Sequence, residues 1–229
     1  MLYTEEMVRQ NLRNREGKRV FYLGKGDTLT PGARDWLARE RIAILPAEQA
    51  KPAVYRLLSG AVLTEKPEHM THLHSDVLVQ KTHPRIRFRG AIDSLEAELL
   101  WCTVHVDGQL RKSLEEILNL ARTLIRCEVL GEPVPEGKLC GLTEDEQRAH
   151  SHRPQDFYGQ PHFMPQAGDG ETVLMLNKCR TAARAAELAA AAAFTDENGN
   201  AEHADILRAL NRMSSMIYIL MIREKAGKA

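Results

Sequence analysis

One stretch of the sequence, residues 81–106, constrains the fold more than any other. Within it, apolar residues recur at alternating spacings of four and three, which is typical of the buried face of an α-helix. These residues are Phe88, Ile92, Leu95, Leu99, Cys102 and Val106. Pro84 suits the first turn of such a helix, where its missing N–H is not needed. The stretch therefore predicts a long helix that packs one face against other helices.

A polar stripe follows one flank of this expected helix. It lies roughly 60–140° from the apolar line at 100° per residue, and it consists of Arg85, Arg89, Asp93 and Glu96. One interpretation is an ordinary solvated flank, which contributes little to stability. The other is a set of ions organised for function.

Four further segments carry helical patterns. A second long helix is expected to end near residue 130, and a short one over residues 143–150 begins with Thr143 as its N-cap. Residues 171–194 form an alanine-rich helix, in which nine of the twelve residues from 182 to 193 are alanine. Residues 201–225 repeat apolar residues at spacings of four and three. About five helices therefore predict a mainly α fold, a helical bundle.

The first 60 residues predict a separate α+β extension. The expected elements are a helix over 4–16, a strand over 18–23, a helix from Thr30 to about 39, and a strand over 42–45. No catalytic constellation occurs there, so we expect a docking or packing role, with substrate contact as the alternative. We therefore divide the chain into an extension, 1–60, and a helical-bundle domain, 61–229.

Composition excludes several classes of partner. The 31 basic and 31 acidic residues cancel, which gives no electrostatic case for a nucleic-acid or membrane partner. No apolar run approaches the ~20 residues that span a bilayer, and the first residues lack the apolar segment of a secretory signal. The four cysteines are far apart, which favours reduced thiols. We therefore expect a cytoplasmic protein.

Two segments outside the long helices carry candidate chemistry. His69, His72, His74 and His83 fall within fifteen residues, which suits either a structural metal or histidines at a surface or beside phosphate. No cysteine pair accompanies them, and we assign no metal ligand. Residues 131–170 hold five of the ten prolines together with aromatic side chains. A connection of this length and composition is usually functional.

Three motifs resemble one known family. VQKTHPRIRFRGAIDSLEAEL resembles the first bundle helix of ATP:cobalamin adenosyltransferases of the propanediol-utilisation type, with their V-P-K-x-x-P-R…G-x-(I/V)-D-E-L-N pattern. With KPEHMTHL before it, the segment is closer still to the ethanolamine-utilisation corrinoid adenosyltransferases. NKCRTAARAAE contains the family's R-x-x-E motif, and ILRALNRMSSMIYILMIRE resembles its final-helix motif L-N-R-L-S-D-x-L-F. The resemblance covers about two thirds of the chain and implies the fold of these enzymes.

The resemblance implies a set of catalytic residues. Arg184 and Glu187 match the R-x-x-E nucleotide motif, and Arg180 matches the arginine four residues earlier. Asp93 and Arg180 occupy positions that form an ion pair between subunits in the family. The alternative for the Arg184–Glu187 pair is an ordinary surface pair worth tenths of a kcal/mol.

Further residues are implied in binding ATP and cobalamin. The family's phosphate loop is glycine-rich, but KPEHMTHLHSD has no glycine, so Lys66, Thr71 and Lys81 must hold more of the phosphate. The other expected nucleotide ligands are Arg85, Asn211 and Arg212. HFMPQAGDG resembles the family's F-I-L-P-G-G segment, where an aromatic residue covers the lower corrin face, and this points to His162 and Phe163.

The function that the resemblance implies is transfer of the 5′-deoxyadenosyl group of ATP to cob(I)alamin, with release of triphosphate. Such a transferase would use ATP, Mg²⁺ and cobalamin, form a homotrimer with sites between subunits, and supply ethanolamine ammonia-lyase. A reductase or microcompartment shell proteins are further expected partners, which would place the protein inside a bacterial microcompartment. Some ethanolamine-type relatives carry a His-and-paired-Cys metal motif that this sequence lacks.

Two other functions stay open. The glycine-poor loop and the added extension suit a non-catalytic carrier of nucleotide or corrinoid, or a microcompartment scaffold. A helical metal-dependent hydrolase has no support, because the sequence shows no paired Glu-x-x-His or His-Asp motif.

Overall fold

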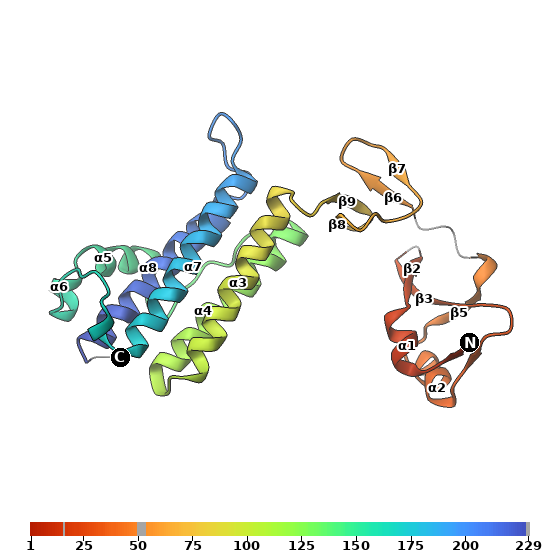
Figure 1. The fold of residues 1–229 in the computed structure, drawn as a ribbon, viewed down its shortest axis with the longest axis horizontal. Coiled ribbons are helices and arrows are strands. Elements are labelled where there is room, and N and C mark those ends of the chain that lie inside the picture. Colours follow the sequence, from red (N-terminus) through yellow and green to blue (C-terminus); the bar gives the residue numbers. More distant parts are fainter. Residues whose placement is uncertain (16, 50–53, 228–229) are drawn as a thin grey trace. The chain divides into compact units, whose positions relative to one another are not determined.

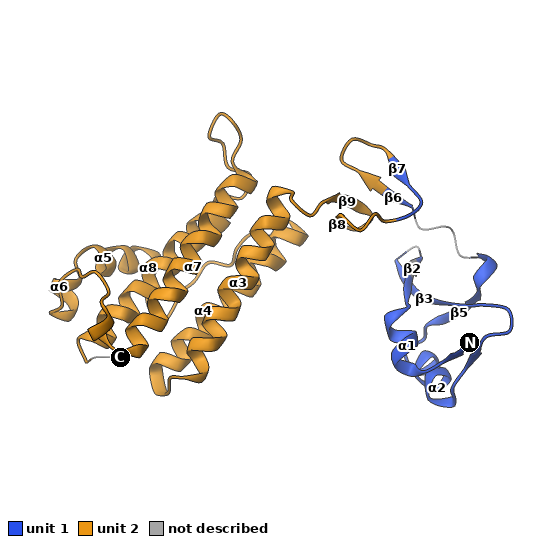
Figure 2. Cartoon of the chain, viewed as in Figure 1, with its two compact units in different colours: residues 1–55, 62–65 blue, residues 56–61, 66–229 orange. Residues whose placement is uncertain are grey.

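The structure, a computed structural model, describes residues 1–15, 17–49 and 54–227, and the chain forms two compact units (Figures 1 and 2). The first unit contains Met1–Tyr55 and Val62–Glu65, and the second contains Arg56–Ala61 and Lys66–Ala229. Eight α-helices occur among the described residues. None of the described helices is long and apolar enough to cross a membrane.

The first unit is a small α+β structure with its own core. Its elements are β1 (Leu2–Tyr3), α1 (Glu5–Gln10), β2 (Arg13–Arg15), β3 (Lys18–Leu23), β4 (Thr28–Leu29), α2 (Pro31–Arg39), β5 (Ala43–Pro46), the 3₁₀ turn η1 (Ala47–Gln49) and β7 (Val62–Leu63). Strand β3 lies between β2, antiparallel, and β5, parallel. The helices α1 and α2 contribute Val8, Ala33, Trp36 and Leu37 to a buried cluster with Phe21.

One prediction for this unit is wrong. The helix expected over residues 4–16 ends at Gln10, because the side chain of Asn11 donates to the Met7 carbonyl at 2.8 Å and closes the last turn. The chain then reverses at Gly17, whose φ of 79° suits glycine, and β2 pairs with β3. The helix that Thr30 caps and the strand β3 were predicted correctly.

The second unit is a helical bundle with a short β-structure beside it (Figure 1). Its long helices are α3 (Pro84–Val104), α4 (Gly108–Leu130), α7 (Glu171–Phe194) and α8 (Ala204–Lys225). Shorter elements are β6 (Tyr55–Leu57), β8 (Met70–His74), β9 (Val77–Gln80), α5 (Glu144–His152), α6 (Pro154–Tyr158) and the 3₁₀ turn η2 (Ala167–Asp169). Strand β9 pairs with β6 in parallel and with β8 antiparallel.

The predicted apolar faces form the core of the bundle. All six residues of the stripe in residues 81–106 are buried, and five of them are fully inaccessible. On α7 the buried positions include Ala183, Ala186 and Ala190, each 0% exposed. Small side chains let helix backbones approach closely, and α7 packs along both α3 and α8. The rings of Phe88 and Phe194 meet edge to face, with their centroids 5.1 Å apart. Because Phe88 lies near the start of α3 and Phe194 at the end of α7, the two helices run antiparallel.

The segment between α4 and α7 is more ordered than its prolines suggested. Thr143 and Glu146 form a capping box at the start of α5, as the sequence predicted for Thr143. The chain then forms α6, an unpredicted helix with Pro154 at its start and Gly159 at its end. The last helix begins at Ala204 rather than 201, because the Glu202 N–H still donates to the carbonyl of Phe194, the last residue of α7.

We expect the alanine face of α7 to tolerate no added volume. Ala190→Leu places a larger side chain at a fully buried position and should lower the free energy of unfolding by about 1–3 kcal/mol. Ala192→Leu, two residues away at an exposed position, is the matched control and should change it by less than about 0.5 kcal/mol. Urea denaturation measures the free energy of unfolding of both variants. Equal losses of that free energy in the two variants would contradict the close packing of this face.

Candidate functional site

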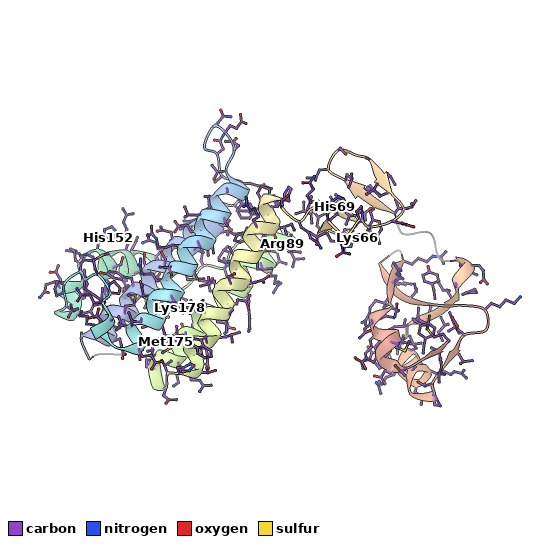
Figure 3. The ribbon with its side chains drawn as sticks, in the orientation of Figure 1. Lys66, His69, Arg89, His152, Met175 and Lys178 are labelled. Atoms are coloured by element: carbon purple, nitrogen blue, oxygen red, sulfur yellow. The ribbon has the colours of Figure 1, made fainter. Side chains whose placement is uncertain are left out.

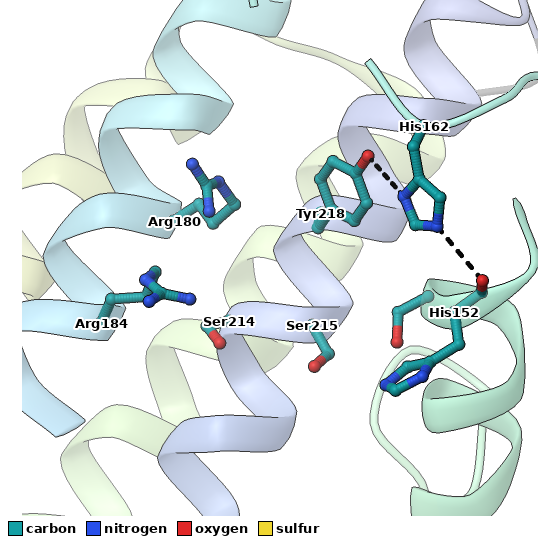
Figure 4. Close-up of a pocket in the computed structure, with 8 residues that line it drawn as sticks. His152, His162, Arg180, Arg184, Ser214, Ser215 and Tyr218 are labelled. Carbon is teal, nitrogen blue, oxygen red and sulfur yellow. Dashed lines mark hydrogen bonds between the residues drawn. The ribbon is translucent and has the colours of Figure 1, made fainter. Parts of the chain in front are cut away.

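A pocket of about 320 Å³ opens between α7, α8, the end of α5 and the segment that precedes η2 (Figure 4). Its lining is polar and cationic, and it consists of Ser151, His152, His162, Arg180, Arg184, Ser214, Ser215 and Tyr218. Three of the residues predicted from the sequence, Arg180, Arg184 and His162, therefore meet in one pocket although they come from two separate segments.

Arg180 and Arg184 stand one turn apart on α7 and extend toward α8 (Figure 4). Arg180 donates from Nε and Nη2 to the Asn177 side-chain oxygen at 3.2 and 3.0 Å. Neither arginine has an ion pair with a carboxylate in the described part of the chain. Partial burial, together with the charge of Arg184, lowers the pKa of the Arg180 guanidinium. Two adjacent cations without a described counterion give the pocket a positive charge that would attract an anion.

A hydrogen-bonded chain links α7 to α8 beside this pocket. Asn211 donates from Nδ2 to Glu187 Oε1 at 2.9 Å, and Arg212 donates to the Asn211 side-chain oxygen. The Arg212 side chain also lines a second cavity of about 340 Å³, with Glu116 of α4 and Gln147 of α5. The structure thus brings Glu187 and Asn211 together, while Arg212 extends to a different flank of α8.

Tyr218 anchors the two residues predicted to cover the corrin face. Its hydroxyl accepts from the Phe163 N–H at 3.4 Å and bonds to His162 Nδ1 at 3.0 Å. His162 Nε2 lies 3.1 Å from the His152 carbonyl, so Nε2 carries the proton and Nδ1 accepts from the hydroxyl in the neutral ring. The His162 and Tyr218 rings are stacked, with 7° between their planes. Lys225 Nζ lies 4.3 Å from the Phe163 ring centroid.

The other predicted nucleotide ligands lie elsewhere in the second unit. Lys66 and His152 are at opposite ends of it in Figure 3. Thr71 is on β8, opposite Val79, and Lys81 follows β9 with its Nζ 3.3 Å from Glu68. None of Lys66, Thr71, Lys81 and Arg85 lines the pocket that contains Arg184.

Arg85 belongs to an ion-pair network at the start of α3. Its guanidinium lies 2.6 Å from Glu202 and 3.6 Å from Glu128, and the bond from Arg85 lowers the pKa of the Glu202 carboxyl. Arg89 of the same flank donates to both carboxylate oxygens of Glu128. The polar stripe predicted on this helix is therefore organised at its first turns rather than freely solvated.

His83, the last of the four clustered histidines, has a structural role at the start of α3. His83 is the N-cap of α3, where Nδ1 accepts from the Arg85 N–H at 3.2 Å. Burial first, and then the charge of Arg85, lowers the pKa of His83, so the ring is held neutral. His72 and His74 lie in β8 on either side of a bulge. Across the described residues, no group of three or more His, Cys, Asp or Glu is placed to hold a metal ion.

Asp93 is exposed on α3 and makes no ion pair with any described residue of its own chain. The pairing of Asp93 with Arg180 that the resemblance implies is therefore absent within the described single chain. Both side chains remain available to a neighbouring copy.

Tyr218, His152 and Ser214 also line the pocket and were not predicted from the sequence. Tyr218 lies seven residues after Asn211, two helical turns along the same face, and this spacing could have revealed it. Nothing local in the sequence marks His152 or Ser214, because their place in the pocket depends on how α5 packs against α8.

Comparison with known proteins identifies the family. The sequence profile of the family described as cobalamin adenosyltransferase matches residues 61–224. The corrinoid adenosyltransferase EutT of Salmonella typhimurium strain LT2 is 31% identical over 242 residues, which cover 96% of this chain and 90% of that protein. This chain belongs to the cobalamin adenosyltransferase family. EutT of Escherichia coli K12 is 29% identical to this family member, with the same coverage.

Solved structures of the PduO-type ATP:corrinoid adenosyltransferase of Lactobacillus reuteri show a weaker likeness to this member of the family. A variant complexed with ATP has a TM-score of 0.49 at 18% identity and covers 67% of this chain and 87% of its own. A variant complexed with cobalamin and ATP has a TM-score of 0.44 at 17% identity and covers 77% of this chain and 88% of its own.

We expect the Tyr218 hydroxyl to order the segment that holds His162 and Phe163. Tyr218→Phe removes the acceptor of the Phe163 N–H, a bond of about 0.5–1.5 kcal/mol, so amide exchange at Phe163 should accelerate while the bundle core is unaffected. Hydrogen-exchange mass spectrometry measures this. Tyr22→Phe, the same change in the first unit, is the control and should leave amide exchange at Phe163 unchanged. Unchanged exchange at Phe163 in Tyr218→Phe would show that the Tyr218 hydroxyl does not order this segment.

Proposed function

We propose that this chain is a corrinoid adenosyltransferase that transfers the 5′-deoxyadenosyl group of ATP to cob(I)alamin. The observation that carries the proposal is its 31% identity with a corrinoid adenosyltransferase over 96% of the chain. The cationic pocket supports it, because Arg180 and Arg184 offer an anion two charges that no described carboxylate neutralises.

The reaction does not require the protein to transfer a proton. The electron pair of cobalt in cob(I)alamin forms a bond to C5′ of ATP, and the bond from C5′ to the triphosphate oxygen breaks. The triphosphate leaves with that bonding pair, and adenosylcobalamin is the other product. No proton moves in this step, so a general base is not required. What the protein supplies is position, charge on the leaving group and exclusion of water.

The described residues suit these tasks. Arg184 would stabilise the negative charge that grows on the triphosphate as it leaves, while Arg180 would pair with Asp93 of a neighbouring copy. Glu187 and Asn211, which already bond to each other, would hold the nucleotide. Lys66, Thr71 and Lys81, which lie at the other end of the unit, would contact the phosphates from a neighbouring copy of the chain. Arg85 and Arg212 are the further cations we propose for the nucleotide; Arg85 is paired with Glu202, and Arg212 donates to the Asn211 side chain.

The aromatic segment suits the corrin ring. His162 and Phe163 are held by Tyr218, and both could lie against an apolar ring while the surrounding structure excludes water. An aromatic cover that takes the place of the lower cobalt ligand would make Co(II) easier to reduce. This is the role we propose for the two residues.

We propose that the site is completed by a second copy, in a homotrimer with one site at each interface. Within one chain, Lys66 lies at the opposite end of the unit from the arginine pocket, and Asp93 lacks a partner among the described residues. A neighbouring copy could bring Asp93 to Arg180 and Lys81 to the triphosphate. Mg²⁺ would enter with ATP, since Mg²⁺ is usually held by substrate phosphates with few protein carboxylates.

For the setting, we propose that the product supplies ethanolamine ammonia-lyase, and the likeness to the EutT proteins supports this. A reductase and microcompartment shell proteins are the further partners we propose, with a cytoplasmic location or one inside a microcompartment. Residues 1–60 would serve docking. The second candidate function, a non-catalytic carrier or scaffold, is favoured by the glycine-free segment KPEHMTHLHSD and by the added N-terminal extension.

The direct test is an anaerobic assay with chemically reduced cobalamin, ATP and Mg²⁺, followed by the loss of cob(I)alamin absorbance. We expect turnover by the parent protein and a roughly 10- to 150-fold lower kcat/KM for ATP in Arg184→Ala, because a charge-assisted phosphate contact is worth about 1.5–3 kcal/mol. Arg111→Ala, which removes an exposed surface pair, is the control. No conversion by the parent at saturation would favour the carrier, and an unchanged Arg184→Ala would remove Arg184 from the site.

A charge swap tests the interface. Asp93→Arg and Arg180→Asp should each dissociate the oligomer or abolish activity, because stranding one charge of a buried pair costs about 3–5 kcal/mol. The double swap should partly restore assembly. Sedimentation velocity of the three variants decides the question, and three oligomers that behave like the parent would make these residues ordinary surface charges.

A further inference from the structure

The strands before α3 are fixed to the bundle by one arginine. Arg89 of α3 donates from Nε to Glu128 Oε2 at 2.8 Å and from Nη2 to Oε1 at 3.2 Å. Nη2 also donates to the Leu73 carbonyl of β8 at 2.8 Å. Arg89 therefore connects α3, α4 and β8 through one guanidinium, at the end of α3 that Figure 3 shows beside the strands.

The carbonyl that Arg89 binds lies at an irregular point of β8. The pairing of β8 with β9 shifts between His72 and His74, so Leu73 is the extra residue of a bulge. Leu73 is 5% exposed, and its carbonyl lies outside the regular ladder. A buried carbonyl needs a donor, and Arg89 provides it.

Glu128 holds the Arg89 guanidinium in place. Its side chain is 0% exposed on α4, so it requires a cation, and Arg89 offers a two-pronged contact while Arg85 lies farther away at 3.6 Å. The planar fork of arginine can bond to the carboxylate and the carbonyl together, which a lysine ammonium at the end of a flexible chain cannot reproduce.

The pairing of β8 with β9 also places Thr71 and Lys81, the two residues that we propose for the phosphates of ATP. Thr71 pairs with Val79 in the same ladder, and the Lys81 N–H donates to the His69 carbonyl at 3.0 Å. A shift of β8 at Leu73 would therefore move Thr71 and Lys81 together.

We propose that Arg89, held by Glu128, is a positioning residue of the nucleotide site: it locks the bulge of β8 and so places Thr71 and Lys81 for the phosphates of ATP. This inference rests on the proposed function, which assigns Thr71 and Lys81 to ATP. The Arg89 guanidinium is occupied by Glu128 and the Leu73 carbonyl, so its effect on the nucleotide would pass through the strands.

Two conservative variants and two matched controls test the proposal in the full-length protein. Arg89→Lys keeps the charge but loses the fork, and Glu128→Gln keeps the shape but loses the charge. Arg122→Lys and Glu96→Gln are the controls, because the Arg122–Glu96 pair also joins α4 to α3 at 2.8 Å but is more exposed and has no bond to β8. Calorimetry gives the Kd for ATP with Mg²⁺, and hydrogen exchange reports on β8 and β9.

We expect Arg89→Lys to speed amide exchange in β8 and β9 and to raise the Kd and KM for ATP about tenfold, or 1.4 kcal/mol, with kcat changed less than twofold. Glu128→Gln should show the same pattern to a smaller extent, and both controls should match the parent. A folded Arg89→Lys that binds ATP like the parent would overturn the proposal, as would loosened strands with an unchanged Kd. Failure of both variants to fold would also overturn it, in favour of a purely structural role.

The same measurements separate this inference from the proposed function. A parent protein that binds ATP but does not consume cob(I)alamin contradicts the transferase, while the Kd values of the variants still decide the role of Arg89. A parent protein that binds no ATP contradicts both.

Discussion

The fully buried alanines of α7 determine most of what the second unit can do. Ala183, Ala186 and Ala190 let α7 pack closely along both α3 and α8. Because that packing fixes the rotation of α7, Arg180 and Arg184 extend into the pocket, and Glu187 reaches Asn211 on α8. The chemistry of the site thus depends on a face that carries no functional group at all.

The same unit holds its candidate groups in two places. One set surrounds the pocket between α7 and α8, and the other lies on or beside β8, β9 and the start of α3. Each set is ordered by contacts of its own, through Tyr218 in the first case and through Arg89 and Glu128 in the second. A single small transition state could use both only if they came from different copies of the chain, which is the arrangement we propose.

The long helices could be predicted from the sequence because the spacing of apolar residues is a local property. The helix predicted over residues 171–194 has the same limits as α7. The helix expected over residues 4–16 was wrong because strand pairing with β3 outweighs local preference there. Arg184, Arg180 and His162 were found through motifs, and the pocket contains all three. The roles of Tyr218 and Arg89 could not be found in this way, because their partners are distant in the sequence. Tyr218 bonds to His162, 56 positions away, and Arg89 bonds to Glu128 and Leu73, 39 and 16 positions away.

The central claim, that one copy supplies the arginines and another supplies Lys81, can be measured by subunit complementation. Arg184→Ala and Lys81→Ala proteins, each impaired alone, are unfolded together, refolded as mixed oligomers and assayed with cob(I)alamin and ATP. In a trimer with sites between subunits, every mixed trimer contains one site with both intact halves, so roughly a quarter of the parent activity should return. Activity that stays at the level of the separate variants, in mixed oligomers shown to have formed, would contradict a site shared between copies.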